Sequence, residues 1–279
     1  MSSIQVDASI TAEFRPSEGI LAQQSLLYIE QSGPIVHLRL NRPGKRNAMS
    51  DSMIRQLHTA FINLPPDARV VVISGEGSHF CAGLDLSEVS EQSVTDGIHH
   101  SRLWHAAFDA IQFGPVPVIS VLHGAVVGGG LELAATTHLR VAEPSAYYGL
   151  PEGQRGIFVG GSGSVRIPRL IGVSRMSDMM LTGRVFDATE GQSMGLSNYL
   201  VREGEGLFRA FELAAKIASN APLSNYAITQ ALPRIAGLAP AEGLFVESLM
   251  SAIAQGDGAA KQRVRDFLEK RANKVEKSS

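Results

Sequence analysis

Residues 116 to 134 read VPVISVLHGAVVGGGLELA, an apolar run rich in β-branched residues, then a glycine-rich turn, then a helical pattern beginning near Gly130. Fully buried strands read as continuous apolar runs, and a helix that follows such a strand covers one face of the sheet. The same kind of apolar run occurs in RVVVIS at 69 to 74 and in HLRVA at 138 to 142. We therefore predict an α/β core whose sheet is covered on both faces.

The segments before this stretch fit the same layered core. SLLYIEQSGPIVHLRL at 25 to 40 holds two β-prone runs around Ser-Gly-Pro, which predicts a hairpin. Ser50 or Asp51 caps a helix that turns Met53, Leu57, Phe61 and Leu64 to one side. The loop GEGSHFCAG at 75 to 83 leads into a polar stretch through Gly97, and a helical pattern follows around 103 to 111.

The pattern divides the chain into three parts. Residues 1–25 show no sustained period and read as a poorly ordered or loosely docked extension. Residues 26–205 carry the alternating strands and helices, whereas residues 206–279 show only helical periods. We predict a core of 26–205 followed by a separate helical region.

Composition limits the possible partners. The chain has 279 residues, of which 44% are hydrophobic and 19% are charged, so it can bury a sizeable core. Its 25 basic and 27 acidic residues give a net charge of −2, which creates no global field for nucleic acid or an anionic membrane. A small-molecule partner is favoured over an RNA-binding module, the non-catalytic alternative for such a chain.

Cysteine usage and the chain start indicate the compartment. Cys81 is the single cysteine, which excludes an internal disulfide and favours a reducing environment. The first residues lack a basic region followed by an apolar run, and the apolar stretch 116–133 is broken by Pro117, four glycines and Glu132. We expect a cytoplasmic protein without a membrane segment.

Several common signatures are absent. The glycines at 124 and 128–130 lack the spacing of a dinucleotide fingerprint or a P-loop. GGSGS at 160–164 has a serine where a nucleophile elbow needs its second glycine, so a serine hydrolase is a weak alternative. His99, His100 and His105 have no carboxylate or cysteine at ligand spacing, and we predict no metal site.

Two glycine turns are candidates for a site. Ala82 and Gly83 allow the N–H of Leu84 to face a ligand, and the N–H of Gly129 lies at the start of the next helix, where main-chain donors lack internal acceptors. Two such donors on one oxygen would form an oxyanion hole. The spacing of the glycines alone favours two ordinary tight turns, because glycine occurs in turns far more often than in catalytic sites.

Two glutamates accompany these turns. Glu132 lies in the first helical turn, where an acid also simply stabilises a helix end, and Glu152 lies in YYGLPEGQRG, which reads equally as an exposed turn. Two carboxyl groups in an apolar site can divide acid and base roles if burial raises a pKa.

The complete series of motifs resembles the crotonase, or enoyl-CoA hydratase/isomerase, superfamily. The likeness spans about residues 26 to 275 and rests on NRPGKRNAM at 41–49, FCAGLDL at 80–86, HGAVVGGGLELA at 123–134, the segment YYGLPEGQRGIFVGGSGSVRIPRLIG, LTGRVFDATEG and the terminal FLEKR. It implies a ββα spiral core with a C-terminal helical oligomerisation region.

The resemblance assigns roles to residues. It implies an oxyanion hole at Leu84 and Gly129, with Glu132 activating water for Cβ and Glu152 delivering a proton to Cα of an enoyl-CoA thioester. Gly160 would help orient that water. The implied activity is therefore that of an enoyl-CoA hydratase, with coenzyme A as part of the substrate and no permanently bound cofactor.

The resemblance also implies contacts to coenzyme A and between subunits. Ala82 and Lys45 would bind the CoA moiety, and Phe267 and Lys270 would reach the CoA of a neighbouring subunit in a homotrimer or homohexamer. A basic C-terminal end fits an anionic partner as well as a solvated helix face. Gln154 and Arg155 stand where hydratases are commonly apolar, which leaves an isomerase, or a hydratase-lyase or hydrolase of aromatic or cyclic acyl-CoA, as alternatives.

Overall fold

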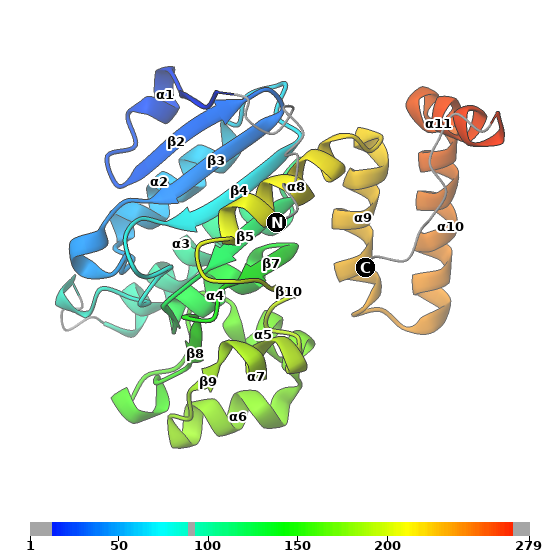
Figure 1. The fold of residues 1–279 in the computed structure, drawn as a ribbon. Helices are drawn as coiled ribbons and strands as arrows, with labels where there is room; N and C mark the ends of the chain where they lie inside the picture. The colour runs from blue at the N-terminus through cyan, green and yellow to red at the C-terminus, as the bar shows by residue number, and fades with distance from the viewer. Residues whose placement is uncertain (1–12, 89–92, 270–279) are drawn as a thin grey trace, which may run out of the picture. The chain divides into compact units, whose positions relative to one another are not determined.

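The computed structural model describes residues 13–88 and 93–269. Its main sheet follows the order β1-β2-β3-β4-β5-β7-β10 (Figure 1). The strands are β1 (Arg15–Pro16), β2 (Leu27–Ser32), β3 (Ile35–Leu40), β4 (Val70–Gly75), β5 (Val118–Leu122), β7 (Leu139–Ala142) and β10 (Tyr199–Leu200). β1, β2 and β3 pair antiparallel, and the pairs from β3 to β10 are parallel.

The central strands are buried on both faces, as their sequence predicts. All five residues of β5 are buried, and so are the first five of β4. In Figure 1, α2 (Asp51–Ile62) and α3 (Val94–Gln112) lie behind this sheet, and α8 (Gly206–Ala218) lies in front. Ser50 caps α2 by accepting a hydrogen bond from the N–H of Met53. The predicted α/β layering is therefore confirmed.

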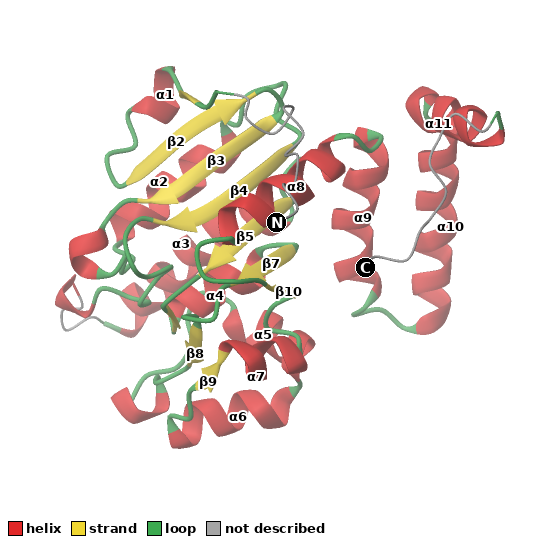
Figure 2. Cartoon of the chain, in the orientation of Figure 1, coloured by secondary structure: helices red, strands yellow, loops and turns green. Residues whose placement is uncertain are grey.

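A second, three-stranded sheet carries the glycine-rich segment. It has the order β6-β8-β9, with β6 (Ala125–Val127), β8 (Tyr147–Gly149) and β9 (Phe186–Asp187). Cys81 forms an isolated bridge with Val126, so the loop after β4 is joined to β6. The helices around this sheet are α4 (Gly129–Thr136), α5 (Gly163–Ile171), α6 (Val173–Thr182) and α7 (Ala188–Met194), as Figure 2 shows.

Two segments differ from the sequence prediction. α3 begins at Val94, well before the periodic run at 103–111, because Ser93 and Asp96 form a reciprocal capping box in the stretch expected to be loop. Residues 15–22 form β1 and the short helix α1 (Gly19–Ala22), and β1 pairs with β2. The rest of the predicted extension, residues 1–12, lies outside the described residues.

The chain forms two compact units, residues 1–217 and 218–279. Almost all of α8 belongs to the first unit, whereas the sequence pattern predicts a helical region that begins at residue 206. The second unit contains α9 (Pro222–Ile235), α10 (Pro240–Gly256) and α11 (Gly258–Leu268). No helix among residues 13–88 and 93–269 is both long and apolar enough to cross a membrane.

Candidate active site

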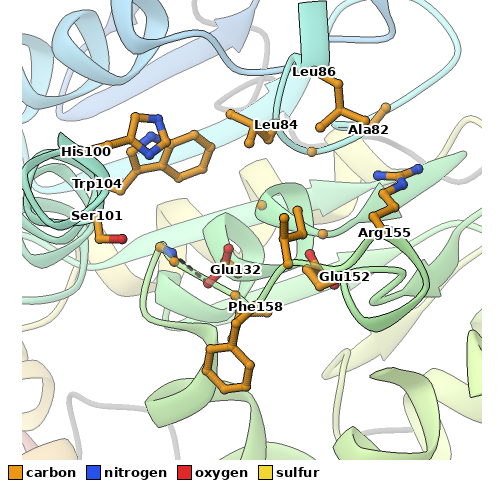
Figure 3. A pocket seen from close by; sticks show the side chains of 18 residues that line it. Ala82, Leu84, Leu86, His100, Ser101, Trp104, Glu132, Glu152, Arg155 and Phe158 are labelled. Carbon is orange, nitrogen blue, oxygen red and sulfur yellow. Dashed lines mark hydrogen bonds between the residues drawn. The ribbon is translucent and has the colours of Figure 1, made fainter. Parts of the chain in front are cut away.

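A pocket of about 280 Å³ lies where four segments of the first unit meet. These are the loop after β4, the first half of α3, the start of α4, and the turn that follows β8 (Figure 3). Both glycine turns and both glutamates singled out in the sequence line it. The lining includes Ala82, Leu84, Gly129, Glu132, Glu152 and Gly160.

The backbone around Leu84 is held on both sides. The N–H of Met49 donates to the carbonyl of Gly83 (2.7 Å), and the N–H of Asp85 donates to the carbonyl of Met49 (2.9 Å). The N–H of Leu84, between these two bonds, donates to no other described residue. A main-chain donor fixed in this way at a pocket wall is available to a ligand oxygen.

Gly129 supplies a second main-chain donor. Its N–H is at the first position of α4 and donates to no residue within 13–88 or 93–269. Gly128 sets the turn with a φ of 54°, and its N–H donates to the carbonyl of Gly149 (2.9 Å). A Cβ placed on Gly83 would lie 3.3 Å from the nitrogen of Gly129, so the two donor segments pass close to each other. The arrangement can stabilise an oxyanion.

Glu132 is held inside the pocket by main-chain groups. Its Oε1 accepts hydrogen bonds from the N–H of Gly161 (2.9 Å) and of Gly163 (2.6 Å), and the residue is 3% exposed. Burial raises the pKa of Glu132 to about 7, with the charge of Glu152 adding to the rise and the two N–H donors opposing it. Glu132 can therefore exchange a proton near neutral pH.

Glu152 enters the pocket from the start of the turn η3 (Gly153–Arg155), which follows β8. The residue is 6% exposed, and its Oε2 is buried without a hydrogen-bond partner among the described residues. Burial raises the pKa of this carboxyl group above its ordinary value. An unpartnered buried carboxyl oxygen can hold or deliver a proton at a ligand atom.

An arginine that the sequence analysis missed fixes the loop opposite α4. Arg166 is 7% exposed and donates to Oε1 of Gln112 (2.6 Å) and Oδ1 of Asp109 (2.6 Å) on α3. It also donates to Oγ of Ser162, which has a positive φ of 87° and donates to the carbonyl of Gly161. Arg166 thus holds the loop whose N–H groups at Gly161 and Gly163 position Glu132. In the sequence, this role is indicated only by the position of Arg166 four residues after Ser162.

Replacing Gly163 with alanine tests how tightly this loop positions Glu132. The new Cβ would lie 2.8 Å from Cγ of Glu132, so we expect Gly163→Ala to lower the free energy of unfolding by about 1–3 kcal/mol. The displaced carboxylate should also lower turnover. Thermal unfolding measures the first effect. The matched helical control is Gly256→Ala, whose Cβ meets no atom within 4 Å. Equal melting temperatures for the two variants would contradict this packing.

The remaining residues predicted to contact coenzyme A are Lys45, Phe267 and Lys270. Lys45 is exposed at the end of the turn η1 (Pro43–Lys45) and is not among the residues that line the pocket. Phe267 is 58% exposed on α11 of the second unit, and Lys270 lies outside the described residues. The histidines do not gather as ligands: His99 is exposed, and His100 bonds to Asp51 across 2.9 Å. No cluster of metal-binding side chains occurs in the part of the chain that the structure describes.

The paired glycine turns and buried glutamates lie on a two-sheet α/β fold of the crotonase class. Comparison supports this class directly, because residues 30–278 match the enoyl-CoA hydratase/isomerase family. The chain therefore belongs to the enoyl-CoA hydratase/isomerase, or crotonase, family.

Relatives of known structure confirm the crotonase fold. A "putative enoyl-CoA hydratase" from Rhodopseudomonas palustris is 55% identical, covers 89% of this chain and 96% of its own, and superposes with a TM-score of 0.86. An enoyl-CoA hydratase from Bacillus anthracis is 30% identical over 88% of this chain and 97% of its own, with a TM-score of 0.83. In sequence comparison alone, enoyl-CoA hydratase EchA19 of Mycobacterium tuberculosis is 31% identical over 249 residues, 88% of this chain and 94% of that protein.

Proposed function

We propose that the protein is an enoyl-CoA hydratase, which adds water across the 2,3 double bond of an enoyl-CoA thioester. The observation that carries this proposal is the placement of two buried carboxyl groups and two unbonded main-chain N–H groups in one pocket. The family acts on CoA thioesters, and relatives named enoyl-CoA hydratase support the choice of reaction.

In the proposed reaction, the thioester oxygen accepts hydrogen bonds from the N–H groups of Leu84 and Gly129. These donors stabilise the negative charge that develops on that oxygen when Cβ is attacked. Ionised Glu132 removes a proton from water as the water oxygen bonds to Cβ, and Gly160 helps orient this water. Protonated Glu152 then supplies the proton that bonds to Cα, so the product is a 3-hydroxyacyl-CoA.

Contacts to the remainder of the substrate and between subunits belong to the same proposal. Ala82 and Lys45 would contact the CoA moiety from the same subunit. Phe267 and Lys270 would contact the CoA of a neighbouring subunit in a homotrimer or homohexamer of this cytoplasmic enzyme. Exposed apolar residues on α10 of the second unit support such an assembly: Leu244, Phe245, Leu249 and Ile253.

The reaction is tested with trans-2-enoyl-CoA thioesters of several chain lengths. Hydration removes the absorbance of the conjugated enoyl thioester, and mass spectrometry should find a product heavier by one water. A product of unchanged mass with a shifted double bond would show that the enzyme catalyses isomerisation and not hydration. Cleavage of an aromatic acyl-CoA would show that the enzyme catalyses the hydratase-lyase or hydrolase reaction.

The rate of hydration should depend on pH through Glu132. A water-activating base works only when it is ionised, and burial raises the pKa of Glu132 to about 7. We therefore expect kcat/KM to rise with pH up to about 7 and to fall about tenfold for each pH unit below it. Initial rates from pH 5 to 9 measure this dependence. A rate that stays constant down to the ordinary pKa range of a glutamate would contradict the role given to Glu132.

A further inference from the structure

Arg155 is held on the turn that carries Glu152. Its N–H donates to the carbonyl of Glu152 (3.0 Å), and the side chain of Gln154 donates to the carbonyl of Thr182 (3.1 Å) on α6. A Cβ on Gly153 would lie 2.2 Å from the carbonyl oxygen of Met180, so this turn packs directly on the α6 backbone. Arg155 therefore projects from a fixed turn next to a buried glutamate.

Arg155 is exposed, and its charge opposes the rise that burial causes in the pKa of the neighbouring Glu152 carboxyl group. Its guanidinium forms no ion pair within 4.0 Å and no side-chain hydrogen bond with any of residues 13–88 and 93–269, although Glu132 and Glu152 line the same pocket. Arg155 is also the one lysine or arginine among the described lining residues. Figure 3 shows its side chain extending from the Glu152 turn toward the side of the pocket where Ala82 and Leu86 lie.

The pocket that Arg155 lines also has apolar side chains in its wall. Leu86, Ile157, Phe158 and Val159 line the pocket together with Arg155. A ligand that covers the exposed guanidinium of Arg155 removes part of its water, and an anionic group on the ligand compensates for that loss. Arginine binds carboxylates through a planar fork of donors, which gives both strength and geometric specificity. The ligand is therefore expected to bring its own anion to Arg155.

We propose that the preferred substrate carries a second carboxylate on its acyl chain, and that Arg155 binds this carboxylate as the residue that determines acyl specificity. The proposal rests on the proposed function, in which Glu152 faces Cα. Arg155 follows Glu152 by one short turn, so its ligand is close to the reacting carbons. The phosphates of CoA are separated from the thioester by the whole pantetheine arm, which favours an acyl carboxylate over a phosphate.

The test compares binding of two saturated thioesters of equal chain length, glutaryl-CoA and pentanoyl-CoA, by titration calorimetry. Wild type should bind glutaryl-CoA at least about tenfold more tightly, as expected for one charge-assisted contact. Arg155→Leu and Arg155→Gln should bring the ratio of the two dissociation constants close to one, and Arg155→Lys should restore part of it. Arg55→Gln, at an exposed arginine of α2 outside the pocket, should keep the wild-type ratio.

Three results would overturn the proposal. Equal binding of both thioesters by wild type, or no binding of either, would show that the pocket does not select a substrate with a second carboxylate. A loss of affinity for both thioesters by the same factor in Arg155→Leu would assign Arg155 to CoA instead. Because the saturated thioesters cannot be hydrated, the preference for glutaryl-CoA is measured independently of the reaction. Failure to hydrate the corresponding enoyl-CoA thioesters would contradict the proposed function alone.

Discussion

Glu132→Gln is expected to lower kcat/KM for hydration by about 10²- to 10⁴-fold, the range that a positioned general base contributes. Glutamine keeps an oxygen that can accept the N–H groups of Gly161 and Gly163, so the loop should retain its place. The side chain can no longer remove a proton from water. The loss should therefore appear in kcat more than in the affinity for the thioester, and steady-state kinetics with an enoyl-CoA measures both.

The same variant should not lose stability. The pKa of Glu132 is raised from 4.5 to about 7 in the folded chain, so its protonated form favours folding, and this benefit is lost as pH rises through that window. Above pH 7 the ionised carboxylate remains buried at a cost that a neutral glutamine avoids. Thermal unfolding at pH 8 should give a melting temperature equal to or above that of wild type.

Glu143→Gln is the matched control for this variant. Glu143 is 8% exposed, lies outside the pocket and accepts the N–H of Gly206 (2.8 Å), which a glutamine oxygen also accepts. It should retain wild-type turnover. A Glu132→Gln variant that is as active as Glu143→Gln would show that Glu132 is not the base that activates water.

Gly83→Ala is expected to lower kcat by about 10²- to 10³-fold, as the loss of an oxyanion donor does in other enzymes. Gly83 has a φ of 96°, and a Cβ there would lie 2.7 Å from the carbonyl oxygen of Val127 and 3.3 Å from the nitrogen of Gly129. The alanine must push the Leu84 and Gly129 segments apart. Two N–H groups that no longer converge cannot hold the same oxygen.

Gly33→Ala separates this effect from backbone strain. Gly33 also has a positive φ, 52°, but its Cβ would meet no atom within 4 Å. The strain of a left-handed alanine, about 1–2 kcal/mol, applies to both variants. Gly33→Ala should therefore lose stability and keep its turnover. Comparable kinetics for the two variants would argue against an oxyanion hole at Leu84 and Gly129.

The strands and glycine turns were predictable because their signals are local. The apolar runs that became β4 and β5, the Ser-Gly-Pro turn between β2 and β3, and the Ser50 cap of α2 each lie within a few residues of sequence. The start of α3 at Val94 was missed although its capping box, Ser93 and Asp96, is also local. That stretch is polar, and its apolar period becomes regular only near Leu103.

The candidate site was predictable only in part. The motif series placed Leu84, Gly129, Glu132 and Glu152 on the sequence, and the structure brings them to one pocket. Two features needed the folded chain. The network of Arg166 joins α3 to α5 across more than fifty positions of sequence, and the burial that raises the pKa of Glu132 depends on packing from several elements.

A crystal structure with a bound 3-hydroxyacyl-CoA product tests the central claim most directly. The proposed function predicts that the thioester oxygen lies within hydrogen-bond distance of the nitrogens of Leu84 and Gly129. It also predicts the 3-hydroxyl group beside Glu132 and Cα beside Glu152. A thioester oxygen bound away from these two nitrogens, or a hydroxyl group without contact to Glu132, would contradict the account.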